Sequence, residues 1–199
     1  MKKENVVLMR EARESLKGKW GVAVGALAIF VVITAAVQQV PKAGPLLGFI
    51  ISGPMSLGFA IFYLTLSRGQ NAKLNNLFDG FEQFGSTIGL AFFIALFTLL
   101  WTLLLIVPGI IAALSYSMAY FVMVDDPSVG PLDAINKSKA MMNGYKWKLF
   151  KLHLRFLGWA ILCLFTLGIG FLWLTPYIQV SLAKFYDDLK SGTEPVVVV

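Results

Sequence analysis

The chain has 199 residues, of which 57% are hydrophobic and only 14% are charged, and its mean hydropathy is +0.73. Soluble domains are about 45–50% apolar and about 25% charged, so this composition excludes an ordinary water-soluble domain. The 17 Lys and Arg residues outnumber the 11 Asp and Glu residues and lie at the ends of apolar segments. We therefore expect them to meet anionic lipid headgroups rather than nucleic acid.

The first predicted element is an amphipathic helix at the membrane surface, over about residues 4–18. Its apolar residues recur at helical spacing on one stripe: Val6, Met9, Ala12 and Leu16. Charged residues occupy its other faces, which is typical of a helix that lies at the headgroup boundary.

The first two predicted membrane spans cover about residues 20–40 and 46–67, with a Pro- and Gly-rich turn between them. The first span, with about 21 residues, is longer than the apolar region of a signal peptide, so we expect an uncleaved anchor. Pro54 lies inside the second span and removes a backbone donor, which predicts a kink there.

A second surface helix is predicted over about residues 72–85, in the polar stretch that follows the second span. Its apolar side chains again recur at helical spacing: Leu74, Leu77, Phe78, Phe81 and Phe84. This pattern indicates a helix with one face against the membrane.

The third and fourth predicted spans cover about residues 88–107 and 109–124, and Pro108 and Gly109 are expected to form the turn. The fourth span has about 16 residues, fewer than the ~20 that cross a bilayer. Three alternatives stay open for it: a crossing of a thinned membrane, a filler between tilted neighbours, or a re-entrant segment.

A third surface helix is predicted over about residues 131–148, followed by spans over about 152–167 and 170–186. Gly168 and Gly170 are expected to form the last turn. One tilted helix over residues 156–183 is the alternative, and two glycines together with Pro176 count against it.

These elements predict an all-α, polytopic transmembrane helical bundle of about six spans in three hairpins, with amphipathic interfacial helices. The single membrane domain covers residues 1–190, and residues 191–199 are expected to form a flexible tail. Every Lys and Arg except Lys42 falls on the side of the N-terminus. The positive-inside rule then places both termini in the cytoplasm.

Short motifs in a fixed order run through the chain. They are Leu16-Lys17-Gly18-Lys19-Trp20, Gly53-Pro54 to Gly58, Leu104-Leu105-Ile106-Val107-Pro108-Gly109-Ile110-Ile111, Tyr116-Ser117-Met118, Asp125-Asp126-Pro127, Ala134-Ile135, Ser138, Met141-Met142-Asn143-Gly144, Gly158-Trp159, Gly170-Phe171-Leu172-Trp173-Leu174 and Pro176-Tyr177. This set resembles the domain of unknown function 975 family, which are small bacterial integral membrane proteins. It is also similar to the membrane portion of some glycerophosphodiester phosphodiesterases, although no phosphodiesterase domain lies in these residues.

The resemblance covers nearly the whole chain and implies a multi-pass protein of the bacterial plasma membrane. It implies no catalytic residue, because none is established for the family. The sequence also shows no Cys or His spacing typical of a zinc site, no Gly-rich phosphate-binding loop and no nucleophile elbow. We therefore predict a protein that is not an enzyme and has no cofactor and no metal site.

Two acidic pairs and one histidine are the remaining ionisable candidates. Asp125-Asp126 and Asp187-Asp188 are predicted to end helices at the water boundary, because a metal ion usually recruits more oxygen ligands than one such pair supplies. His153 is predicted to lie at the interface, and a proton relay is the alternative.

Uncharged polar residues recur within the apolar segments. They are Gln38, Gln39, Ser52, Ser56, Thr98, Thr102, Ser115, Ser117, Thr166, Thr175 and Gln179, with hydroxyls from Tyr116, Tyr120 and Tyr177. One interpretation is hydrogen bonding between helices and repair of interrupted backbone. The other is a polar cavity near Ser52, Ser115, Tyr116 and Tyr177.

The surface helices supply a candidate face for lipid or for a protein partner. Its residues are Leu74, Phe78, Phe81, Met142, Lys146 and Trp147. Passive collars and docking faces are both open, because both use apolar burial at the headgroups and attraction to anionic lipid. We therefore predict a membrane module that binds lipid or a protein partner. The alternative is a transporter or exporter of a small apolar or amphipathic compound, with kinks at Pro54, Pro108 and Pro176.

Overall fold

The computed structural model describes residues 3–192, and these residues form helices and connecting turns without a β-strand. The elements in chain order are α1 (Asn5–Leu16), α2 (Trp20–Gln38), α3 (Gly44–Ser67), the 3₁₀ segments η1 (Leu74–Leu77) and η2 (Asp79–Gln83), α4 (Phe84–Leu104), α5 (Ile106–Tyr116), α6 (Ala119–Asp125), α7 (Pro131–Met141), α8 (Lys146–Phe165) and α9 (Phe171–Lys190). The predicted all-α fold is confirmed. The predicted tail, residues 191–199, lies outside the described part of the chain from residue 193 onward.

Four helical stretches are long and apolar enough to cross a membrane. They are Trp20–Gln38, Gly44–Ser67, Leu74–Leu104 and Ile106–Asp125. Helices α8 and α9 have similar lengths, but charged side chains occupy the first half of α8 and the end of α9. The structure therefore supports a helical membrane protein with four spanning stretches, and the predicted fifth and sixth spans are not among them.

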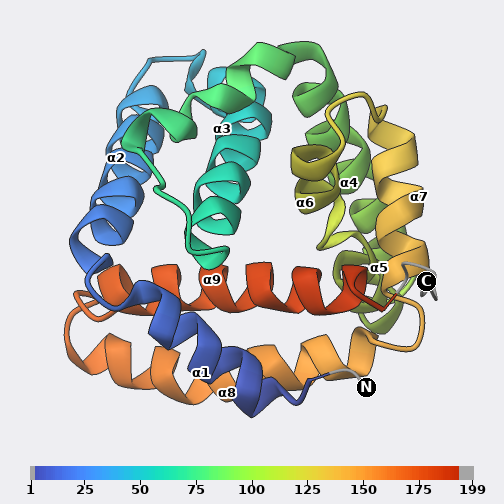
Figure 1. Ribbon diagram of the computed structural model, residues 1–199. Helices are drawn as coiled ribbons and strands as arrows, with labels where there is room; N and C mark the ends of the chain where they lie inside the picture. Colours follow the sequence, from blue (N-terminus) through green and yellow to red (C-terminus); the bar gives the residue numbers. More distant parts are fainter. Residues whose placement is uncertain (1–2, 193–199) are drawn as a thin grey trace.

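Helix α3 is the central spanning helix, whereas α2 and α4 form the periphery. Of its apolar stretch, 56% is buried inside the protein, against 17% for α2 and 11% for the stretch that contains α4. Helix α3 contacts α2, α4, α6 and α9 (Figure 1). In a membrane, the outward apolar surfaces of α2 and α4 therefore face lipid.

The η1 and η2 segments pack on the bare backbone of α3. A Cβ atom on Gly58 would overlap the carbonyl oxygen of Leu77, and a Cβ atom on Gly80 would overlap that of Pro54. Small residues allow two backbones to approach this closely. The surface segment is therefore locked onto α3 through positions that accept only glycine.

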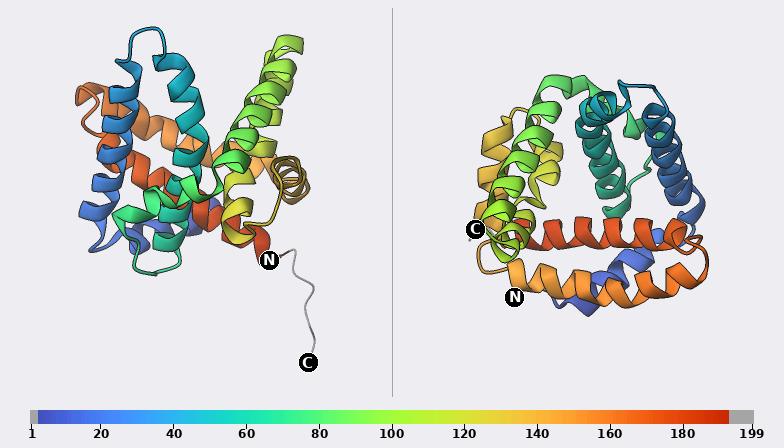
Figure 2. Two further views of the ribbon diagram at one scale, coloured as in Figure 1. Left: turned by 90° about the horizontal axis from the view of Figure 1, so that it is seen from above. Right: turned by 180° about the vertical axis from the view of Figure 1, so that it is seen from behind.

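Three consecutive helix pairs, α2–α3, α4–α5 and α8–α9, are each joined by a short turn, and the two helices of each pair contact each other. In the left view of Figure 2 the pairs diverge from a shared base and their turns lie toward the upper side. Helix α1 and the η1–η2 segment lie at the base in the same view.

The fourth spanning stretch is longer than the sequence predicted. It begins at Ile106 rather than at residue 109, because the chain turns at Leu105 and Pro108 falls in the first turn of α5. Proline is well tolerated there, since a first-turn N–H has no partner inside the helix. The stretch Ile106–Asp125 has 20 residues, which is enough to cross a bilayer.

A break between α5 and α6 is repaired by a side chain from α7. The Ser138 hydroxyl donates to the carbonyl oxygen of Ser115 at 2.7 Å and accepts from the backbone N–H of Met118 at 3.2 Å. Ser138 is fully buried. Backbone groups freed inside a membrane protein need such partners, so α7 helps to hold this span together.

Of the three predicted surface helices, one forms a single α-helix and the other two are divided into shorter elements. Helix α1 matches its prediction, although its buried stripe is Leu8, Ala12 and Leu16 and Val6 is exposed. The predicted helix over 72–85 is two 3₁₀ segments that lead into α4.

The predicted helix over 131–148 divides into α7 and the start of α8. Gly144, with a φ of 78°, forms the turn between them, because the left-handed conformation suits glycine. Helix α8 therefore begins at Lys146, earlier than the predicted start at residue 152.

The residues predicted to form kinks and turns lie partly inside helices and partly in the turn between α8 and α9. Pro54 and Pro176 lie inside α3 and α9, which continue through them. Gly168, with a φ of 85°, lies in the α8–α9 turn, where Gly170 packs against Cys163. Gly109 packs closely against α4 at Thr102.

We expect Gly58→Ala to destabilise the protein by roughly 1–3 kcal/mol, because the new methyl group must displace the backbone at Leu77. Gly85→Ala is the matched control, since a Cβ atom there meets no heavy atom within 4 Å. Alanine favours a helix over glycine, so the control should keep or raise the melting temperature. Thermal unfolding in detergent measures both, and equal melting temperatures for the two variants would contradict the packing argument.

Candidate functional site

A cluster of charged side chains joins the ends of α3, α6 and α9. The Arg68 guanidinium binds both carboxylate oxygens of Asp125, at 2.7 and 3.0 Å, and reaches Asp187 at 2.8 Å. The Lys190 ammonium lies 2.7 Å from Asp125, and the Tyr186 hydroxyl donates to the same oxygen at 3.0 Å. Three elements that are distant in sequence therefore share one polar joint.

This joint is structural in character. The hydrogen bond to Asp125 raises the pKa of Arg68, so the guanidinium stays charged. The sequence predicted only that Asp125 ends a helix, and α6 does end there. It did not predict the joint, because Arg68 and Asp187 are 119 residues apart. The sequence feature that could have indicated the joint is an arginine directly after one charge-free span, together with an acidic pair at the end of another.

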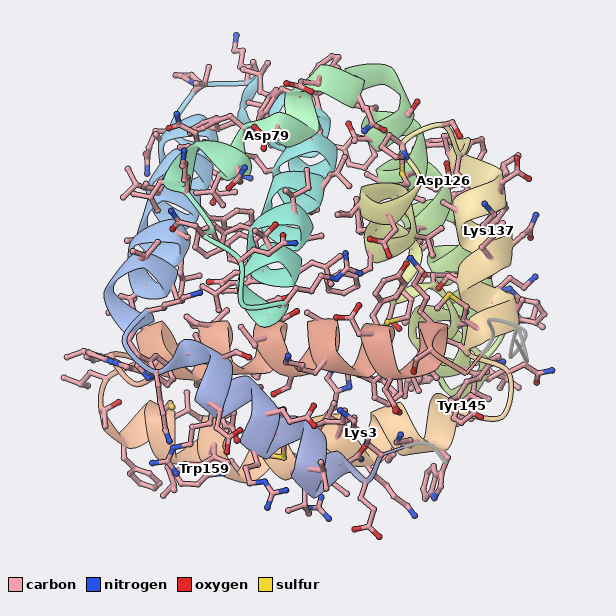
Figure 3. The ribbon with its side chains drawn as sticks, in the orientation of Figure 1. Lys3, Asp79, Asp126, Lys137, Tyr145 and Trp159 are labelled. Atoms are coloured by element: carbon pink, nitrogen blue, oxygen red, sulfur yellow. The ribbon has the colours of Figure 1, made fainter. Side chains whose placement is uncertain are left out.

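The other members of the two acidic pairs are also bound to cations. Asp126 accepts from Ser128 and lies 3.0 Å from the Lys137 ammonium, and these contacts lower its pKa (Figure 3). Asp188 lies 2.9 Å from the Lys148 ammonium. Within residues 3–192, no group of three or more His, Cys, Asp or Glu side chains is arranged to hold a metal ion. Both pairs therefore act in ion pairing between elements.

A basic hollow with a volume of 430 Å³ lies where the start of α1 meets α8. It is lined by Lys3, Glu4, Asn5, Lys148, Lys151 and Arg155. Figure 3 shows Lys3 beside α8, at the crossing of the two helices. Four cations and one carboxylate line the hollow, which makes it a candidate site for an anion.

Contacts among three helices hold the hollow in place. The Asn5 amide donates to the carbonyl oxygen of Lys148 at 2.8 Å, which ties α1 to α8. One oxygen of the buried Asp188 accepts the backbone N–H of Lys3 at 3.1 Å, and the other meets Lys148. These contacts between α1, α8 and α9 fix the position of the hollow within the fold.

Two of the lining cations have no acidic partner in the described part of the chain. Lys148, Lys151 and Arg155 follow one another at spacings of three and four, so they share a face of α8. Lys148 is paired with Asp188. The Lys151 ammonium lies over the ring of Trp147, and Arg155 is exposed. The positive charge of Lys151 and Arg155 is thus available to an external anion.

Three of the four residues of the predicted polar cavity line two separate hollows. Ser115 and Tyr116 line a hollow of 290 Å³ beside α4, and Tyr177 lines another of 380 Å³ with Trp159. The hydroxyls of Ser52 and Ser115 donate to carbonyl oxygens of their own helices, Phe49 and Ile111. Both bonds therefore lie within a single helix and do not join two helices.

A different polar cavity, with a volume of 390 Å³, lies between α2, α3, α6 and α9. Its polar lining comes from Ser56, Ser117, Tyr120, Thr175 and Gln179. All five belong to the recurring polar residues of the sequence. The prediction selected neighbours of these residues, because the sequence does not show how four helices are rotated about their axes.

The predicted partner face is divided between surface and core. Leu74, Phe78 and Trp147 are exposed, and Phe81 and Lys146 are partly buried. Met142 is fully buried and belongs to the core, because the chain turns directly after α7. The exposed part therefore consists of Leu74 and Phe78, near the start of the η1–η2 segment, and Trp147 in the first turn of α8.

The fold and the distribution of charge define the class of protein: it is an all-helical membrane protein. Within residues 3–192, the ion-paired cluster at Arg68 and the basic hollow lie at the ends of apolar helical segments. The chain belongs to the family described as "Protein of unknown function (DUF975)", whose profile matches residues 1–115 and 102–193. The resemblance predicted from the sequence is thereby confirmed. Comparisons with curated proteins and with solved structures gave no match.

We expect Arg68→Ala to lower stability by roughly 2 kcal/mol, because it leaves Asp125 with fewer charged hydrogen bonds in a partly buried site. Lys137→Ala is the matched control. It breaks the more exposed pair with Asp126, and such a surface pair contributes about 0–1 kcal/mol. Melting temperatures in detergent should fall clearly for the first variant and little for the second. Equal losses would show that Arg68 has no special structural role.

Proposed function

We propose that the protein is a non-enzymatic module of the bacterial plasma membrane that binds anionic phospholipid through its charged side. The basic hollow between α1 and α8 is the observation that carries this proposal. A phosphate group there would meet Lys151 and Arg155, two cations without an acidic partner among residues 3–192. Each such cation near a membrane surface contributes about 1 kcal/mol of attraction to anionic lipid.

The surface next to these cations matches the rest of a phospholipid. Leu154, Leu157 and Trp159 are exposed on α8, and Figure 3 shows Trp159 further along α8 from Lys3. A phospholipid combines a charged phosphate with apolar chains, and α8 presents charge first and apolar side chains next. Tryptophan is common at the boundary between these two regions.

The proposed orientation follows from the distribution of charge. The basic residues of α1, α7 and α8 are placed on the cytoplasmic side by the positive-inside rule, and Lys42 in the α2–α3 turn is placed on the opposite side. This orientation puts the hollow next to the cytoplasmic leaflet. The exposed Phe78 and Trp147 would then lie at the same interface.

We expect the double variant Lys151→Gln and Arg155→Gln to bind phosphatidylglycerol at least tenfold more weakly, since it removes two contacts of about 1 kcal/mol each. The double variant Lys137→Gln and Lys139→Gln removes the same charge from α7, outside the hollow, and should weaken binding much less, because Lys137 is already paired with Asp126. Native mass spectrometry after titration with phosphatidylglycerol or phosphatidylcholine measures the retained lipid. Equal retention of phosphatidylglycerol by both double variants would contradict the proposal.

A second candidate function is transport of a small amphipathic compound, and the polar cavity between α2, α3, α6 and α9 favours it. Its volume of 390 Å³ lies in the range of small-molecule sites, about 300–1,000 Å³. It is lined by hydroxyls, one amide and aromatic rings, without a charged side chain. This lining suits a neutral compound rather than an ion.

For this candidate, we expect Gln179→Leu to lower solute flux in reconstituted vesicles several-fold, because it removes the cavity's only amide. Gln70→Leu, at an exposed position outside the cavity, is the control. Flux that is the same with and without the protein, across a panel of neutral amphipathic compounds, would count against transport.

A further inference from the structure

We propose that the α8–α9 pair enters the membrane from the charged side and turns back inside the hydrocarbon region. Its turn would then be surrounded by acyl chains and would not reach water on the opposite side. The depth of this turn in the membrane does not depend on whether the protein binds lipid headgroups.

The charge-free part of each helix is too short to cross a bilayer. In α8 it runs from Phe156 to Phe165, after Arg155, and in α9 it runs from Phe171 to Ala183, before Lys184. At 1.5 Å per residue these segments extend only about 15 and 20 Å, whereas the hydrocarbon core is about 30 Å thick. By contrast, the fourth spanning stretch has 20 residues.

The three helix pairs slant at different angles, and their turns reach different heights. In the left view of Figure 2, the α8–α9 turn stops short of the level that the α2–α3 turn and the end of α4 reach. The bases of the pairs lie on the same side in this view. A pair that starts at the same interface and stops earlier ends inside the membrane.

The side chains at the α8–α9 turn are unusually exposed and apolar. The exposed fractions are 82% for Phe165, 94% for Leu167 and 59% for Ile169, and no charged residue lies among residues 156–183. Contiguous apolar surface of this kind marks contact with a membrane or a partner. Acyl chains are the fitting partner, because the exposed surface continues along α8 through Leu162 and Ile161.

The backbone of the turn makes its own hydrogen bonds, as a lipid environment requires. The N–H groups of residues 166 to 169 and of Phe171 donate to nearby carbonyl oxygens. The Thr166 hydroxyl accepts from the N–H of Gly170 at 3.0 Å and donates to the carbonyl oxygen of Cys163 at 2.7 Å. Each N–H group from 166 to 171 therefore has a partner within the turn.

The α2–α3 turn differs in the polarity of its side chains, which makes it an internal reference. It contains Lys42, whose charge favours water. It also contains Gln38 and Gln39 at the end of α2. The reference turn is therefore suited to the aqueous boundary, and the α8–α9 turn is suited to hydrocarbon.

Single-cysteine accessibility tests the proposal in the full-length protein in its membrane. In a Cys163→Ala background, the reporters are Leu167→Cys at the turn, Lys42→Cys at the reference turn and Glu14→Cys on the charged side. A membrane-impermeant maleimide is applied to intact cells and to inverted vesicles. Reaction of every reporter after solubilisation in detergent controls for folding and for thiol reactivity.

We expect Lys42→Cys and Glu14→Cys to react from opposite sides and Leu167→Cys to react from neither side until detergent is added. A bimane on Leu167→Cys, in protein reconstituted into vesicles, should be quenched more strongly by lipids brominated deep in the acyl chain than by headgroup quenchers. Reaction from the side of Lys42→Cys would show a complete crossing. Reaction from the side of Glu14→Cys, or stronger headgroup quenching, would place the turn at the surface. Each of these results overturns the proposal.

Discussion

Backbone contact at the buried helix α3 is the constraint on which the other elements depend. Gly58 and Gly80 let the η1–η2 segment lie directly on α3, and that segment leads without a gap into α4. Side chains larger than hydrogen at these positions would push the two backbones apart. The position of the surface segment therefore depends on the absence of side chains at Gly58 and Gly80, and Gly53 allows the same close approach of α4 at Thr87. Helices α6 and α9 then pack against the remaining surface of α3.

Polar groups complete this arrangement at two depths. Near the ends of the helices, Arg68 ties α3 to α6 and α9 through carboxylates that water partly reaches. Deeper inside, Ser138 serves the interrupted backbone between α5 and α6, where it is fully buried. At these two sites the charged groups keep some contact with water, whereas the fully buried partner is a neutral hydroxyl, in line with the cost of burying an ion.

Much of the fold could be predicted from the sequence, because hydropathy and charge are properties of single segments. The four apolar stretches, the existence of helix α1 and the turn at Gly168 all follow from local patterns. The cavity residues could not be predicted in this way. Ser52 and Ser56 lie one helical turn apart on the same face of α3, so the position of neighbouring helices along α3 decides that Ser56 lines the cavity. The joint at Arg68 likewise depends on tertiary contacts between distant segments.

Helix α8 explains why six spans were predicted where four meet the requirement of length and composition. Its first half carries basic side chains and its second half is apolar, so a span placed from residue 152 onward takes in the apolar half and leaves most of the charges outside. The change occurs at Arg155, and a bilayer presents the same change from headgroup to hydrocarbon. A helix of this kind is held at one depth, because moving inward buries charge and moving outward exposes Phe165 and Leu167. The proposed headgroup site and the proposed depth of the turn are thus two consequences of one pattern in α8.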